Sequence, residues 1–256
     1  MDIEAEGIRN IRDPGGIVNK EGKTIRPKCF IRSAELSTMT DLDERLLAGE
    51  FRLSTVIDLR TDREITERPD IIPAGVEYHH LPLYEESALG ITWEKGLRMR
   101  RMLAKLPDLG ELYKHMLTDE RSLEHFRAVF RLIIEHEPGS ALLWHCTEGK
   151  DRCGITAALV LTLLDVDREI IFDDYLKSNI TARKKAKKFF FLVLAFAGGF
   201  KKAKQVEKLF LAEREYLQAA FDAIDEVHGG ADSFFRNKLQ ISDEERKQFK
   251  ERFLMQ

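Results

Sequence analysis

The stretch that decides the fold is ALLWHCTEGKDRCGITAALVLTLL, from Ala141 to Leu164. Its first four residues are apolar and predict a short buried strand, and the run from Ile155 to Leu164 predicts a buried helix. Between them lies a polar loop, His145 to Gly154, which we call the site loop. A strand, a tight polar loop and a helix often form an anion site, because the loop amides and the helix N-terminus converge on one point.

The composition is that of an ordinary globular protein. The chain has 256 residues, of which 43% are hydrophobic and 33% are charged, so it can bury a core and is not disordered. The net charge of −3 gives no reason to expect nucleic acid as a partner. Cys29, Cys146 and Cys153 cannot form a disulfide framework and lack zinc-finger spacing, which indicates a reducing compartment.

The chain shows no targeting or membrane signal. Its first ten residues, MDIEAEGIRN, lack the basic start and apolar core of a signal peptide. The longest strictly apolar run, Phe189 to Ala197, is far too short to cross a bilayer. We therefore expect a cytoplasmic protein that does not insert stably into a membrane. The sequence also has no cluster of metal ligands, so we expect neither a metal nor another cofactor.

The rest of the chain predicts one α/β domain over residues 1–256, with an all-helical carboxyl-terminal third. We find no internal repeat and no linker. The expected elements are a hairpin turn at Glu21-Gly22, a helix capped by Thr40 that stops near Gly49, strands at 53–59 and from Gly75 to Pro82, helical sequence over 93–137, a helix that stops at Gly229-Gly230, and a last helix capped by Ser242.

The site loop contains the groups that a phosphate monoester requires. The amides of Thr147 to Arg152 can point inward together, and the helix dipole adds to their positive field. The planar guanidinium of Arg152 can bind two phosphate oxygens at once. The same field would lower the thiol pKa of Cys146 to about 4–6, which makes it a thiolate and a nucleophile at neutral pH.

Asp151 can supply the proton that a leaving alcohol or phenol needs and can then activate water. Two other interpretations remain: Cys146 can be inert packing, and Arg152 can cap a carbonyl. The strand-loop-helix context with Gly149, Gly154 and Asp151 favours the chemistry. A nucleotide-triphosphate loop is excluded, because Lys150 is followed by an aspartate and the upstream glycine is missing.

HCTEGKDR, from His145 to Arg152, resembles the signature of bacterial cysteine-dependent tyrosine phosphatases that also act on phosphoserine, phosphothreonine and phosphoinositides. The resemblance extends to NIRDPGG (10–16), RSA (32–34), VIDLRT (56–61), DDYLKSN (173–179) and the segment around YLQAAFDAIDEVHGG. It implies a tyrosine phosphatase fold: a central, mostly parallel sheet flanked by helices, with a helical lid.

The resemblance also implies roles for individual residues. Cys146 matches the nucleophile, Arg152 the phosphate-binding arginine and Asp151 the general acid within the loop. Lys150 matches a lysine linked with acceptance of highly anionic, lipid-like head groups. Asp58 and Arg60 match a supporting pair at the edge of the site, although they can also be an ion pair that only supports the loop. The remaining residues expected to contact substrate are Thr147, Glu148, Gly149, Cys153 and Gly154.

Two residues depart from the family pattern. Glu148 replaces a small residue, and its negative charge at the loop rim disfavours polyanionic substrates. Cys153 replaces a serine or threonine whose hydroxyl stabilises the thiolate, and a thiol is a weaker donor. Its sulfur can also lie near that of Cys146 and form a disulfide after oxidation, or it can simply pack in the helix.

The segment between Asp174 and Glu207 has no acidic residue and is rich in lysine. One interpretation is a helical hairpin with solvated basic ends; another is a cover over an anionic pocket, or a surface that makes weak contact with anionic lipid. We expect a helical lid over about 183–205.

We therefore predict a metal-independent phosphatase that acts on phosphorylated proteins or phosphoinositides through a phosphocysteine. The alternatives are a rhodanese-like sulfurtransferase, which also holds a cysteine in an amide-lined loop, and a phosphate-binding module without catalysis. The intact Cys146, Asp151 and Arg152 argue against the module.

Overall fold

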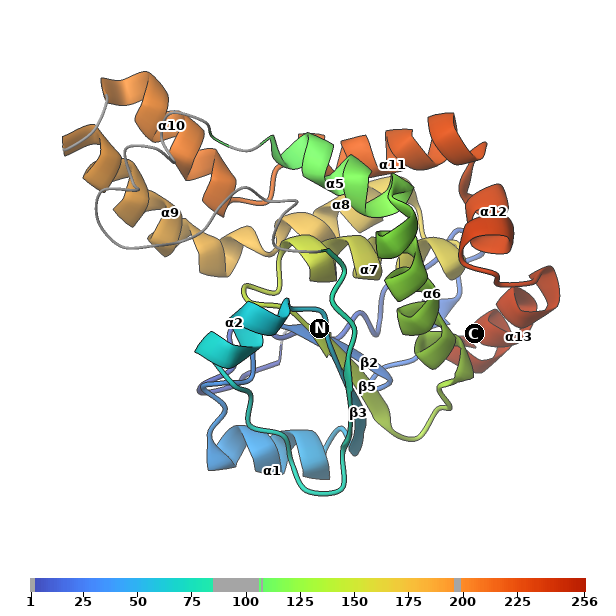
Figure 1. The fold of residues 1–256 in the computed structure, drawn as a ribbon. Coiled ribbons are helices and arrows are strands. Elements are labelled where there is room, and N and C mark those ends of the chain that lie inside the picture. Colours follow the sequence, from blue (N-terminus) through green and yellow to red (C-terminus); the bar gives the residue numbers. More distant parts are fainter. Residues whose placement is uncertain (1–2, 85–105, 107, 196–198) are drawn as a thin grey trace.

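A computed structural model describes residues 3–84, 106, 108–195 and 199–256. A four-stranded sheet lies at its centre, and every pair of neighbouring strands in it is parallel. In spatial order, the strands are β2 (Phe30–Ser33), β5 (Ala141–His145), β3 (Leu53–Asp58) and β4 (Glu77–His80). The prediction of a mostly parallel sheet flanked by helices is confirmed (Figure 1).

The central strand β5 is apolar on both faces because both faces are covered. Its alternate residues point to opposite sides of the sheet. Leu142 and Trp144 pack into the larger core, together with the helices that follow in the chain. Ala141 and Leu143 pack into a smaller core with Leu47 of α1 (Asp41–Gly49). Such two-sided burial is typical of parallel sheets.

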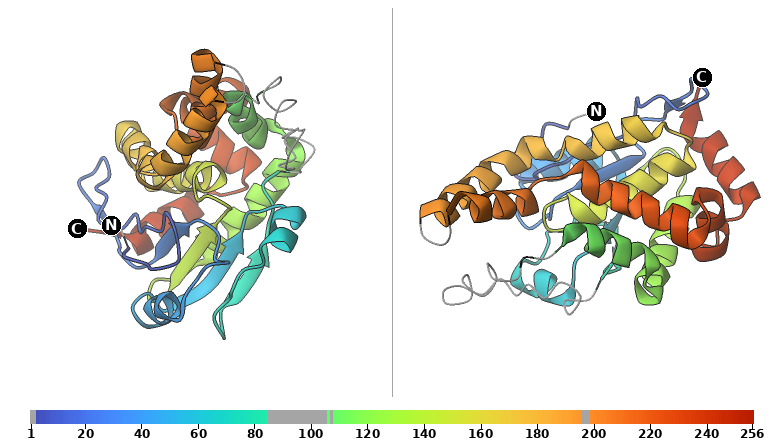
Figure 2. Two further views of the ribbon diagram at one scale, coloured as in Figure 1. Left: turned by 90° about the vertical axis from the view of Figure 1, so that its left-hand side faces the viewer. Right: turned by 90° about the horizontal axis from the view of Figure 1, so that it is seen from above.

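The remaining helices form most of the molecule around the sheet (Figures 1 and 2). They are α2 (Asp62–Glu67), α5 (Leu109–Thr118), α6 (Glu120–Glu135), α7 (Asp151–Leu163), α8 (Arg168–Leu176), α9 (Asn179–Val193), α10 (Gly199–Phe210), α11 (Arg214–His228), α12 (Ala231–Ser233), the π-helical turn η2 (Phe234–Lys238) and α13 (Asp243–Phe253). The carboxyl-terminal third is helical, as predicted. No described helix is long and apolar enough to span a membrane.

Local signals in the sequence locate several helix ends correctly. Thr40 caps α1 in a reciprocal capping box with Asp43, and Ser242 caps α13 in the same way with Glu245. Helix α11 ends at Gly229, which takes the left-handed conformation with φ +75°. The helix after the site loop starts at Asp151, earlier than the apolar run that begins at Ile155.

The amino-terminal hairpin is only partly as predicted. Gly22 lies in a turn with φ +78°, and a single bridge joins Val18 to Thr24. The strand β1 (Thr24–Ile25) then pairs antiparallel with β6 (Leu254–Met255) at the other end of the chain. The expectation of helix up to the carboxyl terminus is therefore wrong at its last residues, because their backbone groups pair with the exposed edge of β1.

Helices α9 and α10 pack against each other as a hairpin that extends away from the sheet (Figures 1 and 2). Its base is closed by Asn179, whose side chain donates to the carbonyl of Ala212 at 2.8 Å and accepts from the amide of Ala212 at 2.7 Å. The predicted lid, 183–205, falls on this hairpin, except that residues 196–198 lie outside the described residues. Most of the helical sequence expected from Trp93 to Pro107 also lies outside them.

Candidate active site

The site loop leaves the carboxyl end of β5, between the ends of β2 and β3. The loop follows a tight path, and this path requires glycine at two positions. Gly149 has φ +65°, and a Cβ there would lie 2.6 Å from the carbonyl of Ser33. A Cβ on Gly154 would lie 2.8 Å from the ring of Tyr175. Both contacts are closer than packed carbon atoms allow, so no larger side chain fits at either position without displacing its neighbours.

Side chains from the amino-terminal motifs hold the loop by its carbonyl groups. Asn10 donates to the carbonyls of Glu148 at 3.0 Å and of Gly149 at 2.9 Å. The buried Arg32 donates to the same Gly149 carbonyl at 2.9 Å. Asp174 accepts from both Arg12 and Arg32 at 3.3 Å. These contacts fix the backbone path of the site loop.

Cys146 is buried at the start of the loop, with 2% of its surface exposed. Burial raises the pKa of its thiol, but hydrogen bonds from the thiol and the amide of Cys153, together with the charge of Arg152, lower the pKa to about 6. A Cys146 thiolate is therefore the main form at pH 7. Burial and the neighbouring Cys146 raise the pKa of Cys153 well above its ordinary value, so Cys153 stays a thiol and can donate.

Arg152 is held by a carboxylate that the sequence analysis did not identify. Its Nη1 and Nη2 donate to the two carboxylate oxygens of Glu64 at 2.6 and 2.8 Å. Nη1 also donates to the carbonyl of Leu59 at 3.1 Å, and the guanidinium stacks on the ring of Tyr84 at 4.8 Å. Nη2 also donates to the Thr147 hydroxyl at 3.4 Å, whereas no described hydrogen bond uses Nε, so this N–H remains available to a phosphate. Burial raises the pKa of Glu64, but Arg152 outweighs it and lowers the pKa to about 2.

Thr147 joins the same group, since its hydroxyl donates to the Glu64 carboxylate. Glu64 lies in the first turn of α2, where it also forms a capping box with Thr61. The sequence TDRE, from Thr61 to Glu64, is a detectable capping signal directly after the DLR motif. That signal identifies the helix start, but it does not reveal the contact with Arg152.

Asp151 lies at the first position of α7, with 28% of its side chain exposed. Tyr113 of α5 donates from its hydroxyl to the Asp151 carboxylate at 2.7 Å, and the Tyr113 and Tyr175 hydroxyls lie 2.7 Å apart. Burial raises the pKa of Tyr113 well above its ordinary value, and the nearby Asp151 adds to this effect. Tyr113 therefore remains a donor at neutral pH. No pattern in the sequence indicated this contact.

Asp58 and Arg60 lie beneath the loop, and neither side chain is exposed. Arg60 donates to Asp58 at 2.7 Å and to Asp70 at 2.5 Å. Although burial raises the pKa of Asp58, His145 and Arg60 lower it below its ordinary value. Both side chains lie within a closed network of charges, and their expected contact with substrate stays a prediction. The alternative, an ion pair that supports the loop, matches these contacts.

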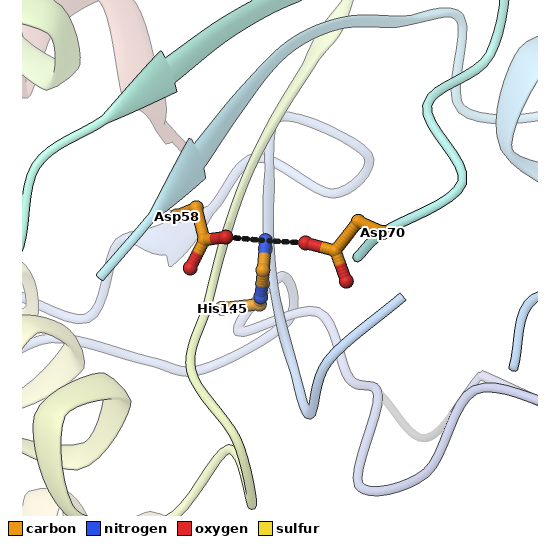
Figure 3. A group of neighbouring side chains, drawn as sticks. All are labelled: Asp58, Asp70 and His145. Carbon is orange, nitrogen blue, oxygen red and sulfur yellow. Dashed lines mark ion pairs between the residues drawn. The ribbon is translucent and has the colours of Figure 1, made fainter. Parts of the chain in front are cut away.

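Figure 3 shows His145 between Asp58 and Asp70, from whose carboxylates its Nε2 lies 3.8 and 3.1 Å away. The donor atoms of these three buried side chains lie close enough together to hold a metal ion. However, Arg60 already pairs with both carboxylates. A second cation would have to compete with it for the same oxygens, so this group does not indicate a metal site.

Lys150 and Glu148 both contact the α9–α10 hairpin. The buried Lys150 ammonium donates to the carbonyls of Leu209 at 2.9 Å and of Leu211 at 3.0 Å, where α10 ends. Glu148 accepts from Lys185 of α9 at 2.5 Å and from Arg9 at 3.3 Å. The Lys150 ammonium also lies 3.4 Å from the Asp151 carboxylate. Contact of Lys150 with substrate therefore stays a prediction. The rim charge of Glu148, in turn, is already paired with two cations.

The site loop follows a parallel strand, starts with a low-pKa cysteine and has a buried arginine six residues later. This combination defines a cysteine-dependent phosphatase. A model of the tyrosine phosphatase family matches residues 3–255, and the chain belongs to that family. The chain is therefore an enzyme that hydrolyses phosphoric monoesters. Membership supports this function over the rhodanese-like and non-catalytic alternatives.

Curated relatives agree with this placement. The chain is 28% identical to the triple specificity protein phosphatase PtpB of Mycobacterium tuberculosis, over 91% of this chain and 92% of that protein. It is 29% identical to a putative tyrosine-protein phosphatase of Cupriavidus necator, over 94% of this chain and 85% of that protein. Among solved structures, the Siw14 catalytic core aligns with 86% of this chain and 96% of its own, at 13% identity and a TM-score of 0.36.

Proposed function

We propose that catalysis proceeds through a phosphocysteine formed on Cys146. The observation that carries this proposal is the lowered thiol pKa of a cysteine at the entrance of α7, between the Cys153 donor and the Arg152 charge. A thiolate in that position is a nucleophile that needs no separate base. The positive end of the helix and the loop amides then stabilise the dianion that it attacks.

Arg152 binds the transferring phosphoryl group through the guanidinium edge that Glu64 leaves available. In the first step, the Cys146 sulfur forms a bond to phosphorus while the phosphorus–oxygen ester bond breaks. Protonated Asp151 gives its proton to the leaving oxygen. In the second step, the Asp151 carboxylate takes a proton from water as the water oxygen attacks phosphorus. The sulfur–phosphorus bond breaks, and inorganic phosphate and the Cys146 thiolate are released.

The other groups position this machinery. Glu64 fixes the plane of the Arg152 guanidinium, and Tyr113 fixes the Asp151 carboxylate by its 2.7 Å hydrogen bond. Asp58 and Arg60 support the start of the loop from below. Gly149 and Gly154 allow its close path. The loop amides, with Thr147, complete the phosphate site. None of these steps requires a metal ion.

We infer that the substrates are phosphotyrosine proteins, with phosphoserine, phosphothreonine and phosphoinositides as further substrates. The name of the related PtpB, a triple specificity phosphatase, supports this breadth. Pairing of Glu148 with Lys185 and Arg9 also weakens the repulsion that its charge alone would exert on polyanions.

We also infer that residues 1–256 form one domain. We infer a cytoplasmic location as well, and the three free cysteines support this location.

The test compares Cys146→Ser and Arg152→Lys with the parent enzyme, using p-nitrophenyl phosphate for turnover and tungstate for binding. Cys146→Ser should abolish turnover and keep tungstate binding, because serine leaves the amide cradle intact. Arg152→Lys should weaken both, because the bidentate contact is lost. Cys29→Ser is the matched control, since Cys29 is a buried cysteine outside the loop. Turnover by Cys146→Ser, or equal loss of binding and rate in it, would contradict the assignment.

A further inference from the structure

The far end of the α9–α10 hairpin exposes aromatic and aliphatic side chains. Phe191 is 63% exposed, Phe200 is 64% exposed and Leu194 is 40% exposed. The partly buried Phe190 joins them, with its ring 5.3 Å from that of Phe191 and 5.8 Å from that of Phe200. We call these four residues the tip cluster. Water-exposed apolar residues gathered in one place mark a contact surface rather than ordinary scatter.

Basic side chains lie along the same two helices as the tip cluster. The exposed cations are Arg183, Lys184, Lys187 and Lys188 on α9 and Lys201 and Lys204 on α10. Helical spacing places Lys184, Lys187 and Lys188 on the same side of α9 as Phe191. These three lysines form no ion pair with the described residues. The acid nearest in sequence on α10, Glu207, already pairs with Lys204 at 2.7 Å.

We propose that the tip cluster and its lysines dock the enzyme on an anionic membrane surface. Exposed phenylalanine and leucine combined with lysines on the same helix supply both terms of interfacial binding, burial of apolar area and attraction to anionic lipid. Anionic head groups attract such lysines, and acyl chains accept the rings without a matching pocket. An acidic protein would satisfy the lysines, but it would leave Phe191 and Phe200 exposed unless it had a complementary groove.

The hairpin also connects this surface to the site loop. Lys185, on the same helix, contacts Glu148 at 2.5 Å, and Phe191 lies about 9 Å further along α9. Interfacial helices bury their apolar face by about 5–10 Å. Insertion of the tip would therefore bring the rim of the loop close to the head groups. This consequence rests on the proposed function, whereas docking itself does not.

The test measures co-sedimentation with vesicles of phosphatidylcholine alone and of phosphatidylcholine mixed with phosphatidylserine. The enzyme should bind the mixed vesicles and dissociate from them as the salt concentration increases, and it should not bind vesicles of phosphatidylcholine alone. Phe191→Ser with Phe200→Ser, and separately Lys184→Glu with Lys188→Glu, should each weaken binding about tenfold or more. The control pair is Leu42→Ser with Arg45→Glu on α1, where Leu42 is 57% exposed.

Turnover of p-nitrophenyl phosphate should stay at the parental rate in all three double variants, which shows that they fold. Turnover of a phosphoinositide in vesicles should fall only in the two hairpin variants. Equal binding by parent and hairpin variants, no binding to mixed vesicles, or preferential capture of polyglutamate would each overturn the docking proposal. If a hairpin variant loses turnover in vesicles but keeps turnover of p-nitrophenyl phosphate, the phosphocysteine chemistry is unaffected. The docking proposal and the proposed function can therefore fail independently of each other.

Discussion

Glu64 binds Arg152 through two parallel hydrogen bonds of 2.6 and 2.8 Å, although 87 residues lie between them in the chain. The carboxylate takes the terminal edge of the guanidinium, and the Nε edge stays directed elsewhere. An arginine held in this way loses little conformational freedom when it binds a phosphate. Glu64 therefore acts on catalysis by orienting Arg152 rather than by touching substrate.

The first prediction concerns Glu64→Gln. This variant loses the paired, charge-assisted contact, and hydrogen bonds to charged groups contribute about 1.5–3 kcal/mol, so kcat/KM for p-nitrophenyl phosphate should fall about ten- to a hundredfold. Alkylation of Cys146 by iodoacetamide should remain fast, because the thiolate does not depend on Glu64. Glu67→Gln, on the exposed face of the same helix, is the control. A parental kcat/KM would exclude the orienting role.

The second prediction tests the contact between Tyr113 and Asp151. Asp151→Asn should slow phosphoserine hydrolysis more than p-nitrophenyl phosphate hydrolysis, since nitrophenol is a good leaving group that hardly needs a proton. Tyr113→Phe should show the same dependence on the leaving group with a smaller loss, because Asp151 stays but is no longer held. Equal losses on both substrates in Tyr113→Phe would indicate a packing role only.

Local patterns predicted the elements whose residues carry their own signals. The apolar β5, the capping boxes of α1 and α13 and the glycine stop of α11 depend on residues a few positions apart. The β1–β6 pair could not be predicted, because each strand has two residues and is defined only by its distant partner. Most of the fold was therefore predictable from the sequence, but not the way the two ends of the chain meet.

In the active site, too, some features are predictable from the sequence and others are not. The motif identifies Cys146, Asp151 and Arg152 by type and spacing, and the strand-loop-helix context brings them together. It does not say which way a long side chain points. Lys150 belongs to the motif, yet its ammonium reaches the end of α10. The partners Glu64 and Tyr113 come from other helices, so only the folded structure reveals their contacts with the loop.

The third prediction follows from this direction of Lys150. Lys150→Met should lower turnover of a phosphoinositide and of p-nitrophenyl phosphate by the same factor, since the ammonium donates to two protein carbonyls at the end of α10. Loss of these buried hydrogen bonds should also lower the thermal midpoint by about 3–8 °C. Lys184→Met, on the exposed face of α9, should leave the midpoint unchanged. Selective loss of phosphoinositide turnover would instead place Lys150 in the pocket.

The fourth prediction concerns the pH at which Cys146 becomes reactive. The parent should be alkylated by iodoacetamide with a midpoint near the Cys146 pKa of about 6, slower below it and faster above it. Cys153→Ala removes the thiol donor and should move the midpoint upward, because the thiolate loses a hydrogen bond that favours it. Cys153→Ser retains a donor and should keep the midpoint low. An unchanged midpoint in Cys153→Ala would show that the Cys153 thiol does not stabilise the thiolate.

The last prediction concerns oxidation of the same pair. Cys153 lies close enough to the Cys146 sulfur to lower its pKa, and neither cysteine is in a disulfide. Hydrogen peroxide oxidises the Cys146 thiolate to a sulfenic acid and is itself reduced to hydroxide. The Cys153 thiol can then displace that hydroxyl as water and form a disulfide, which stops further oxidation. Dithiothreitol should therefore restore the peroxide-treated parent.

In Cys153→Ser no neighbouring thiol is present to trap the sulfenic acid, so further peroxide should carry Cys146 to forms that dithiothreitol does not reduce. The measurement is the activity recovered after matched exposures, with Cys29→Ser as the control because Cys29 is the third buried cysteine. Disulfides accept only a narrow range of Cα separation and direction, so the recovery experiment also tests whether the two sulfurs can meet. Equal recovery in parent and Cys153→Ser would show that Cys153 serves only as a hydrogen-bond donor to the thiolate.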